Sequence, residues 1–289
     1  MNELRPGMAV NEAARALRRA LEPIGAAHEA RWLLLSALGC TDAGLLLSGA
    51  QPLTQAQAQT LGAQLQRRLA GEPLQYVLGE WEFAGCPLFV GPGALIPRAD
   101  TEILLERALA LCKAEGFASA LDLCTGSGAL AVALAAYAGL KTVAAADISP
   151  QALFWARKNA ARSRLAIEFY EGDLFAPVPG RFDLIVSNPP YIPTGDLAGL
   201  DREVREHEPR LALDGGADGL AFYRRIAAEA GGHLTPGGAL LLEVGVGEAG
   251  AVQALLRGAG FANIRCTKDL AGIPRVVEGR APARGAQGA

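Results

Sequence analysis

Apolar residues recur with a helical period through the first part of the chain. Over Val10–Ile24 they follow one another at steps of four and three residues, which places them on one face of a helix. Thr54 and Gln57 form a Thr-x-x-Gln capping box ahead of a second apolar stripe over Ala58–Leu69. We therefore expect residues 1–72 to form a small all-α helical bundle domain.

Beyond this region the pattern changes to alternation. Tyr76 and Leu78 alternate with other residues before a Gly-Cys-Pro turn signal, and Leu88 and Val90 do so after it. Alternating apolar residues on either side of a turn predict a β-hairpin. We expect residues 73–92 to form this hairpin and to link two domains.

Strands and helices then alternate along the chain. Asp100 or Thr101 is expected to cap a first helix, and Ser149 is expected to cap a later one that has Pro150 at its first position. The expected strands are 120–123, 142–147, 166–170, 184–187 and 239–244, and the expected helices include 129–138, 220–230 and 248–256. Such alternation predicts a parallel sheet that helices cover on both faces.

The end of the chain departs from this alternation. Two short strands, 263–268 and 274–278, follow each other with no helix between them, which predicts a terminal antiparallel hairpin. We assign residues 93–280 to one α/β domain. Residues 281–289 are small and polar, and we expect a disordered tail.

Composition and charge narrow the functional classes. The chain has 289 residues, of which 51% are hydrophobic and 20% charged, as in folded soluble proteins. Its formal net charge of -3 provides no general positive field for a phosphate backbone, so nucleic acid is a weaker candidate partner than protein. The five cysteines form no Cys-x-x-Cys pair, which disfavours a disulfide framework or a zinc site.

The sequence also predicts a location. The first ten residues carry charges and lack the apolar stretch of a signal peptide. The longest apolar run, Ala129–Leu140, is shorter than the roughly 18 residues that would span a bilayer. We expect a cytoplasmic protein with no membrane partner.

The first chemical signal is a glycine turn between a strand and a helix. It consists of Cys124, Thr125, Gly126, Ser127 and Gly128. Glycines let a ligand approach the backbone, and the start of the helix offers unpaired N–H groups. The pattern also satisfies the Gly-x-Gly-x-x-Ala form of the dinucleotide fingerprint, so a nicotinamide enzyme has to be considered.

Two acidic residues follow later strands. Asp147 ends the next strand, 19 residues beyond Gly128, where a carboxylate can accept both hydroxyls of a ribose. This position serves NAD and S-adenosylmethionine (SAM) equally, and Asp147 could instead cap the turn before Pro150. Asp173 could accept the amino protons of adenine while Leu174 or Phe175 covers the ring, although a loop aspartate is often part of an Asx-turn.

The most informative signal is Asn188-Pro189-Pro190-Tyr191, which directly follows an expected strand. A planar NH2 group has a conjugated lone pair and donates two hydrogen bonds in its plane. The side-chain oxygen of Asn188 and the carbonyl of Pro189 can accept both, and the prolines fix the loop. Tyr191 can stack on the flat face of the acceptor. This motif predicts catalysis at a planar nitrogen, whereas the alternative interpretation is a simple turn.

These residues resemble the amino-methyltransferases, which act on DNA adenine, ribosomal RNA guanine or protein glutamine. Three further features are similar to the release factor glutamine methyltransferases: the block Pro97-Arg98-Ala99-Asp100-Thr101-Glu102, the block Glu208-Pro209-Arg210-Leu211-Ala212-Leu213 with the glycines that follow it, and the helical front end. The resemblance extends from about Ala13 to Arg280.

The resemblance implies a fold, a reaction and a partner. The fold would be a Rossmann-like class I SAM methyltransferase domain, with a mostly parallel seven-stranded sheet and a terminal antiparallel hairpin. The substrate would be the amide nitrogen (N5) of the glutamine in the Gly-Gly-Gln motif of class I peptide chain release factors. S-adenosylhomocysteine would be the product of SAM, and no metal would be needed.

The same resemblance implies site residues. Cys124 to Gly128, Asp147, Leu174 and Asn188 would contact SAM, and Asn188 to Tyr191 would contact the glutamine. Cys124 is a departure, because many members have glycine there. The alternatives are a nucleic-acid amino-methyltransferase, which shares the Asn-Pro-Pro-Tyr motif, and a non-catalytic SAM or nucleotide sensor.

Other polar residues receive simpler interpretations. His28, His207 and His233 are scattered along the chain, which disfavours a catalytic histidine. Charged residues dominate Asp201–Glu208, which is either a solvated face or a lid over the site. Arg98 and Thr101 are candidates for the pocket wall, and Arg98 could equally pair with an acid.

Overall fold

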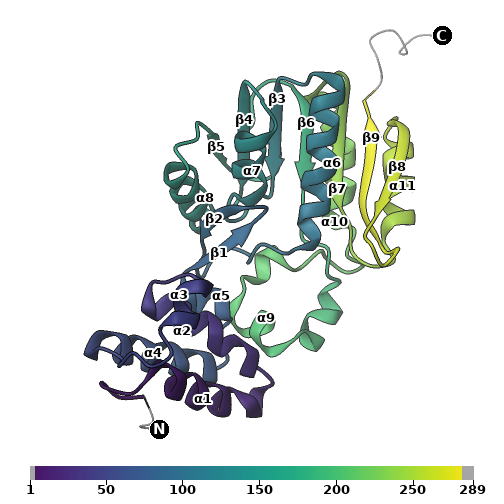
Figure 1. Cartoon of the computed structure of the whole chain (residues 1–289). Coiled ribbons are helices and arrows are strands. Elements are labelled where there is room, and N and C mark those ends of the chain that lie inside the picture. The colour runs from purple at the N-terminus through teal and green to yellow at the C-terminus, as the bar shows by residue number, and fades with distance from the viewer. Residues whose placement is uncertain (1–3, 282–289) are drawn as a thin grey trace, which may run out of the picture. The chain divides into compact units, whose positions relative to one another are not determined.

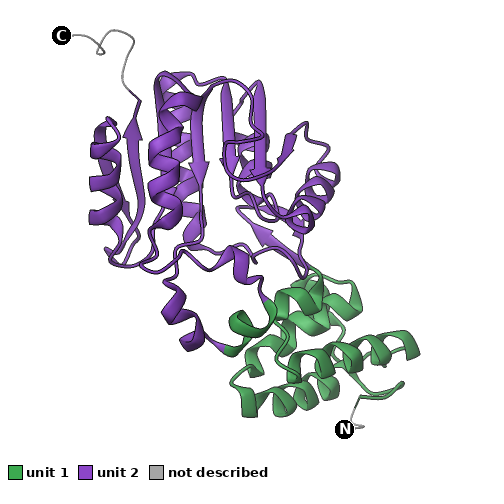
Figure 2. Cartoon of the chain, turned by 180° about the vertical axis from the view of Figure 1, so that it is seen from behind, with its two compact units in different colours: residues 1–79, 202–207 green, residues 80–201, 208–289 purple. Residues whose placement is uncertain are grey.

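The computed structural model describes residues 4–281, and it divides into two compact units. Unit 1 comprises residues 1–79 and 202–207, and unit 2 comprises residues 80–201 and 208–289 (Figure 2). Within the described residues, no helix is long and apolar enough to cross a membrane.

Unit 1 is helical, as predicted. Its α-helices are α1 (Val10–Leu21), α2 (Ala30–Leu38), α3 (Asp42–Leu47), α4 (Gln55–Leu69), α5 (Leu74–Leu78) and α9 (Arg202–His207), with 3-10 turns at Glu22–Ile24 and Ala27–Glu29. The predicted capping box is confirmed: Gln57 N donates to Thr54 Oγ1 at 3.2 Å, and Thr54 N donates to Gln57 Oε1 at 2.9 Å. Leu17, Leu33 and Leu61 are fully buried in the core of this unit.

The prediction of a strand around Tyr76 and Leu78 is wrong, because this segment forms α5. A short apolar run fits a strand and a helical turn equally well. Here the backbone carbonyls of Tyr76 and Val77 accept hydrogen bonds from the Arg67 guanidinium at 2.8 and 3.1 Å, which satisfies the end of a short helix. The predicted hairpin itself is present and begins later.

Unit 2 begins with that hairpin and continues into a seven-stranded sheet. The hairpin pairs β1 (Glu80–Phe83) with β2 (Cys86–Phe89). The strands of the sheet, in the order β5-β4-β3-β6-β7-β9-β8, are β5 (Glu168–Glu171), β4 (Thr142–Asp147), β3 (Ser119–Leu123), β6 (Phe182–Ser187), β7 (Leu234–Glu243), β9 (Pro274–Arg280) and β8 (Ala262–Lys268). All neighbours are parallel except β9, which runs antiparallel to β7 and β8, so the predicted terminal hairpin is confirmed.

Helices cover both faces of the sheet, as the alternation predicted. They are α6 (Asp100–Glu115), α7 (Ala129–Tyr137), α8 (Pro150–Arg162), α10 (Ala221–His233) and α11 (Ala249–Gly258), with 3-10 turns at Thr194–Gly199 and Arg210–Ala212. In Figure 1, α6 and α7 lie on one face and α10 and α11 on the other. Successive strand residues contribute to opposite layers: Leu121 and Leu123 pack with α10 and α11, and Ala120 packs with α6 and α7.

The two predicted helix starts have different outcomes. Ser149 caps α8 and accepts a hydrogen bond from Ala152 N at 3.2 Å, with Pro150 as the first helical residue, as predicted. The predicted cap of α6 is wrong, since the N-cap is Ala99 and it makes no side-chain capping bond. The Asp100 carboxylate instead forms an ion pair with Arg275 at 3.0 Å, which joins the start of α6 to β9.

The predicted tail falls almost entirely outside the described residues. Ala281 is described, and its N donates to the carbonyl of Gly238 at 2.9 Å. Residues 282–289 lie beyond the part that the structure describes.

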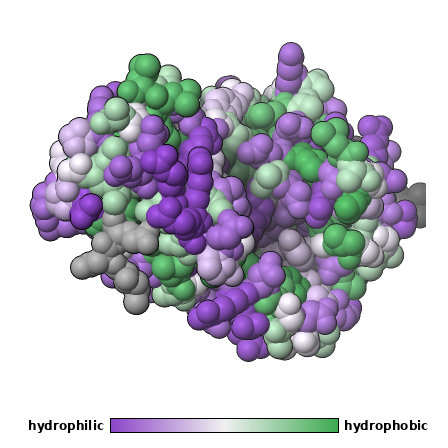
Figure 3. Space-filling view, turned by 60° about the horizontal axis from the view of Figure 1, so that its bottom comes forward, coloured by the Kyte–Doolittle hydropathy of each residue, from purple (hydrophilic) through white to green (hydrophobic). Residues whose placement is uncertain are grey.

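Large apolar side chains are exposed at separate points of the surface. On the face drawn in Figure 3, hydrophobic residues form small groups among hydrophilic ones. Ile148 and Leu211 are 50% and 54% exposed, and both line the cavity described below. A ligand in that cavity would cover them, which makes the cavity a candidate binding site.

Candidate active site

The sheet register brings three loops to one edge. Leu123 at the end of β3 pairs with Ala146 of β4 on one side and with Ser187 of β6 on the other. The residues that follow these partners are Cys124, Asp147 and Asn188. They leave the carboxyl ends of adjacent parallel strands, where ligands bind in open α/β folds.

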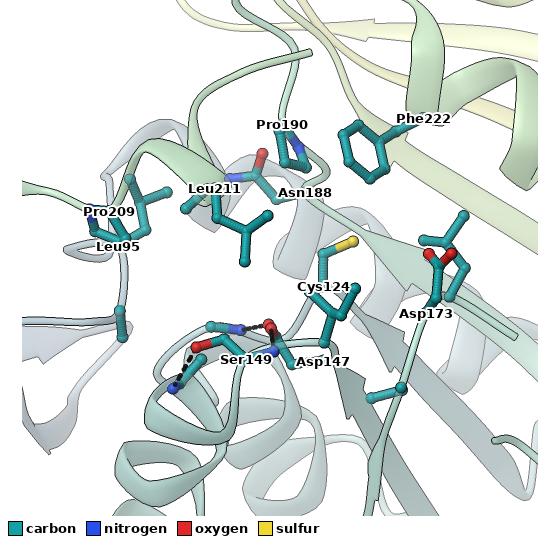
Figure 4. Close-up of a pocket in the computed structure, with 18 of the residues that line it drawn as sticks. Leu95, Cys124, Asp147, Ser149, Asp173, Asn188, Pro190, Pro209, Leu211 and Phe222 are labelled. Atoms are coloured by element: carbon teal, nitrogen blue, oxygen red, sulfur yellow. Dashed lines mark hydrogen bonds between the residues drawn. The ribbon is translucent and has the colours of Figure 1, made fainter. Parts of the chain in front are cut away.

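A cavity opens at this edge, with a volume of about 910 Å³ that includes its solvent-open mouth. Predicted site residues that line it are Cys124, Gly126, Asp147, Asp173, Leu174, Asn188 and Pro190. Asn188 and Pro190 lie across the cavity from Asp147 and Ser149 (Figure 4). Apolar side chains and a few polar groups line it together, which is the usual composition of small-molecule and cofactor sites.

A buried carboxylate at the end of β3 holds the glycine turn through hydrogen bonds. Asp122 Oδ2 accepts hydrogen bonds from the Thr125 hydroxyl at 2.6 Å and from Ala131 N at 3.1 Å. Burial raises the pKa of Asp122 to about 7. Thr125 and Ser127 are buried and lie outside the cavity lining, so their side chains support the turn.

Gly128 is required for helix packing in this structure. Its backbone φ is +81°, and a Cβ there would lie 2.9 Å from the Cα of Ala156 on α8. Gly128 is not among the residues that line the cavity, whereas Gly126 is. The two glycines of the predicted turn therefore have different structural tasks, one toward the cavity and one toward α8.

Two cavity residues other than glycine have left-handed backbone. Cys124 has φ +58° and Leu174 has φ +48°. A residue with a side chain rarely adopts this conformation, and it is concentrated at functional sites. Burial raises the pKa of the Cys124 thiol, so the sulfur that faces the cavity stays protonated.

Asp147 is oriented by the backbone around it. Its Oδ2 accepts from Gly126 N at 2.9 Å, and its Oδ1 accepts from Ser149 N at 2.9 Å. Burial is the largest influence on its pKa and raises it, against these hydrogen bonds, which lower it. Asp147 therefore does shape the turn before Pro150, and its carboxylate keeps acceptor capacity for a ligand hydroxyl.

Asp173 lies at the opposite end of the cavity from Leu95 and Pro209 (Figure 4). Its carboxylate pairs with Arg225 of α10 at 2.7 Å, and both side chains are about half exposed. Both residues line the cavity. The second carboxylate oxygen can still accept a hydrogen bond from a ligand amine.

The Asn-Pro-Pro-Tyr loop is held by a glycine-rich segment. Ile192 N donates to Leu213 O at 3.0 Å, and Gly215 N donates to Ile192 O at 2.8 Å. A Cβ on Gly215 would lie 2.7 Å from the backbone of Tyr191. These contacts fix the path of the chain after Pro190 through close backbone packing.

Asn188 and Pro190 line the cavity, whereas Pro189 and Tyr191 are not among the lining residues. The Tyr191 ring packs against the sheet core, and burial raises the pKa of its phenol to about 12. Asn188 Nδ2 donates to Thr101 Oγ1 at 3.2 Å. The structure thus brings the amide of Asn188 and the carboxylate of Asp147 to one cavity.

The two sequence blocks of the family resemblance meet in unit 2. The Arg98 guanidinium forms an ion pair with Glu208, whose carboxylate also accepts from Ile96 N at 3.2 Å. Pro209 and Leu211, which follow Glu208, line the cavity. Of the two interpretations of Arg98, pairing with an acid is confirmed.

Sequence reasoning missed part of the cavity wall. The lining also includes Leu95, Ile148, Leu211, Phe222 and Arg225. Ile148 carried a usable signal, because an apolar residue directly after Asp147 at the mouth of a site is expected to meet a ligand. The other four come from distant segments, and no local pattern marks them.

The charged run after Asp201 forms helix α9 and not a loop. Within unit 1, Arg68 forms ion pairs with Glu203 of this helix and with Glu29, the latter at 2.5 Å. The Arg68 side chain is 4% exposed. The run is therefore anchored through a buried arginine, and its role as a lid stays a prediction.

Comparison with protein families gives two matches. A model of the PrmC N-terminal domain matches residues 9–79, and a model of the methyltransferase small domain matches residues 99–200. Among solved structures, a methyltransferase from Pyrococcus furiosus is similar with a TM-score of 0.51 and 18% identity, over 78% of this chain and 98% of that one. A 16S rRNA methyltransferase from T. thermophilus is similar with a TM-score of 0.50 and 19% identity, over 70% and 49%.

The strand order, the cavity at the strand ends and these matches define a SAM-dependent methyltransferase of the class I fold, as the sequence predicted. Curated relatives extend over most of the chain. A release factor glutamine methyltransferase from Geobacter sulfurreducens is 46% identical, over 87% of this chain and 88% of its own length. One from Cereibacter sphaeroides is 44% identical, over 94% and 99%. The chain belongs to the release factor glutamine methyltransferase family.

Within residues 4–281, no group of three or more histidine, cysteine or acidic side chains is placed to hold a metal ion. The cavity is lined by the Asp147 carboxylate, which accepts from the backbone N–H of Gly126, by backbone groups at the strand ends and by apolar side chains. An accepting carboxylate beside apolar walls fits the ribose hydroxyls and the flat base of a nucleoside, which SAM contains.

Proposed function

We propose that this protein transfers the methyl group of SAM to the side-chain amide nitrogen (N5) of the glutamine in the Gly-Gly-Gln motif of class I peptide chain release factors. The observation that carries the proposal is the position of Asn188 at the end of β6, on the cavity that Asp147 lines from β4. Release factor glutamine methyltransferases that match across both units support this substrate.

We assign the nucleoside of SAM to the β4 and β5 side of the cavity. Asp147 would accept the ribose hydroxyls, and Asp173 with Leu174 would meet the adenine. Cys124 to Gly128 would supply backbone groups beneath the remainder, with Gly126 open to the cavity and Thr125, Ser127 and Gly128 as its support. Each charge-assisted bond from a hydroxyl to Asp147 contributes roughly 1.5–3 kcal/mol.

We assign the acceptor amide to the Asn-Pro-Pro-Tyr loop. Asn188 Oδ1 and the carbonyl of Pro189 would accept the two N–H bonds, which orients a flat nitrogen that has little nucleophilic character of its own. Pro190 fixes the loop. Tyr191, whose ring packs against the sheet core and whose phenol stays protonated, would support the loop from the core side.

SAM supplies a methyl on a sulfonium: the C–S bond breaks as the N–C bond forms, S-adenosylhomocysteine leaves, and the amide nitrogen releases one proton to solvent. The chain's own contribution is alignment, which can account for roughly 7–11 kcal/mol of the barrier. The apolar side chains of Leu95, Leu211 and Phe222 would keep water from the reacting atoms.

The test uses purified full-length protein, SAM labelled in its methyl group and a class I release factor. We expect label on the native Gly-Gly-Gln protein and none on a Gly-Gly-Asn version, because the shorter side chain cannot bring its amide to the loop. Label on both proteins, or on neither, would reject the substrate assignment. We also propose that the protein acts in the cytoplasm, as the sequence predicts.

A further inference from the structure

A buried carboxylate lies directly behind Asn188. Glu243 is the last residue of β7, and the residue before it, Leu242, pairs with Ser187 of β6. Glu243 and Asn188 therefore leave adjacent strands at the same level. Only 2% of the surface of Glu243 is exposed, so its charge depends on protein partners.

Glu243, Thr101 and Asn188 form a connected group. Asn188 Nδ2 donates to Thr101 Oγ1 at 3.2 Å. The Glu243 carboxylate lies next to both side chains, and each lowers the pKa of Glu243, as a hydrogen-bond donor to a carboxylate does. Glu243 Oε2 is buried without a hydrogen-bond partner among the described residues. Since an ionised carboxylate can only accept, the directions of these bonds are determined: the Thr101 hydroxyl and the Asn188 NH2 are the donors.

This arrangement selects one orientation of the Asn188 amide. If the amide were turned over, its Oδ1 would face the carboxylate and the Thr101 hydroxyl oxygen with no hydrogen between them. A buried acceptor without a donor costs about 1–3 kcal/mol. The ionised carboxylate therefore keeps Nδ2 on its own side and leaves Oδ1 as the free acceptor.

We propose that Glu243 and Thr101 are positioning residues for methyl transfer, which occupy the NH2 end of Asn188 so that its oxygen is presented to the NH2 of the acceptor. The inference rests on the proposed function, because it assigns a task to the Asn188 oxygen. Neither residue has to touch the substrate. Both act through the orientation of one side chain.

The groups around Glu243 give the arrangement a pH dependence. The pKa of Glu243 is raised to about 7, chiefly by burial; Asp100 on α6 also raises it, whereas Thr101, Arg275 on β9 and Asn188 lower it. Asp100 and Arg275 are themselves paired at 3.0 Å.

Two phenols complete the surroundings. The Tyr191 ring carries a hydroxyl whose pKa Glu243 raises, and the Tyr223 hydroxyl of α10 donates to the backbone carbonyl of Glu243 at 2.8 Å. A protonated Glu243 can donate a hydrogen bond, so it tolerates either orientation of the Asn188 amide. The turnover of the wild type should therefore rise with pH through about 7.

The test variant is Glu243→Gln, which has the same shape and no charge. We expect kcat at pH 8 to fall about 10- to 100-fold through loss of alignment, with KM for SAM unchanged. In this variant, the increase of kcat with pH near 7 should disappear. Thr101→Val should lower kcat in the same way, and Thr101→Ser should restore it because the hydroxyl returns.

Glu278→Gln is the matched control. Glu278 is also a buried glutamate of this sheet, but its carboxylate pairs with Arg107 at 2.7 Å and lies outside the Asn188 group. We expect this variant to lose stability. Its kcat per folded enzyme, and the increase of kcat with pH near 7, should stay as in the wild type.

Stability separates positioning from a structural role. The folded pKa of Glu243 exceeds its ordinary value of 4.5, so the native state binds more protons between pH 4.5 and 7, and this group lowers stability as pH rises through that window. Glu243→Gln should therefore be at least as stable as the wild type at pH 8, as thermal unfolding will show.

A second readout is independent of turnover. In the wild type without acceptor, the 15N-labelled side-chain amide of Asn188 should shift with pH near 7 in the NMR spectrum, and it should not shift in Glu243→Gln. If the wild type shows this shift and methylates no release factor, the proposed function fails and the positioning geometry stands. Wild-type kcat and an unchanged increase of kcat with pH near 7 in Glu243→Gln, or no shift in the wild type, would overturn the inference.

Discussion

Asn188→Ala is expected to lower methyl transfer about 100- to 1000-fold, because it removes one of two acceptors that orient the amide of the substrate. The folded protein should remain, since Asn188 is only partly buried and packs at the end of β6. SAM should still bind, because in the proposed arrangement its nucleoside would contact Asp147 and Gly126 on neighbouring loops. Single-turnover kinetics and SAM titration measure the two effects separately.

The complementary variant is Asp147→Ala. It removes the carboxylate that accepts from Gly126 N and Ser149 N, so it should weaken SAM binding more than it lowers the maximal rate. If the Asn188→Ala enzyme had the wild-type rate, or if its whole defect lay in SAM binding, Asn188 would not bind the acceptor amide.

Gly215→Ala is expected to have the second-largest effect. The new Cβ would lie 2.7 Å from the Cα and carbonyl carbon of Tyr191 and 2.7 Å from the carbonyl oxygen of Gly219, and all three are backbone atoms that cannot rotate away. The Asn-Pro-Pro-Tyr loop has to move, and a displacement of 1 Å can reduce turnover about 100-fold. The overpacked variant should also lose about 1–3 kcal/mol of stability.

Gly199→Ala is the matched control for this effect. Gly199 lies in the turn Thr194–Gly199, on the same stretch of chain after the loop, and a Cβ there would meet no atom within 4 Å. Neither Gly199 nor Gly215 has positive φ, so the pair differs in space and not in backbone strain. Equal turnover of both variants, measured at 25 °C with saturating SAM, would show that the glycine segment does not position the loop.

The sequence predicted those features that depend on local periodicity. Short apolar strands separated by amphipathic helices specify a parallel sheet, and their ends place Asp147 and Asn188 at its carboxyl edge. The capping box at Thr54 and the start of α8 at Pro150 were also predictable, because their bonds join residues three positions apart.

Features that depend on contacts between distant segments could not be predicted from local periodicity. Residues 74–78 read equally as a strand or a helical turn, and the choice follows from Arg67, which lies on another helix. The turn glycines looked alike in sequence, although Gly128 meets Ala156 of α8 and Gly126 meets the cavity. Leu211 and Phe222 reach the cavity only because the chain returns to it.

The partner of a buried group is equally invisible in one sequence. Thr101 was predicted as a helix cap or as a pocket residue, yet it is not among the residues that line the cavity, and its hydroxyl accepts from Asn188 across 87 residues of chain. Glu243 had no local motif, and the register of β6 and β7 brings it behind Asn188. Both examples show that side chains near a site are assigned by tertiary contacts and not by spacing.

The most direct test is a crystal structure of the enzyme with S-adenosylhomocysteine and a peptide that contains Gly-Gly-Gln. The account predicts that the glutamine amide nitrogen lies about 2.7–3.2 Å from Asn188 Oδ1 and from the carbonyl oxygen of Pro189, with its free face toward the sulfur. A sulfur that points away from this loop, or a glutamine amide bound elsewhere in the cavity, would contradict it.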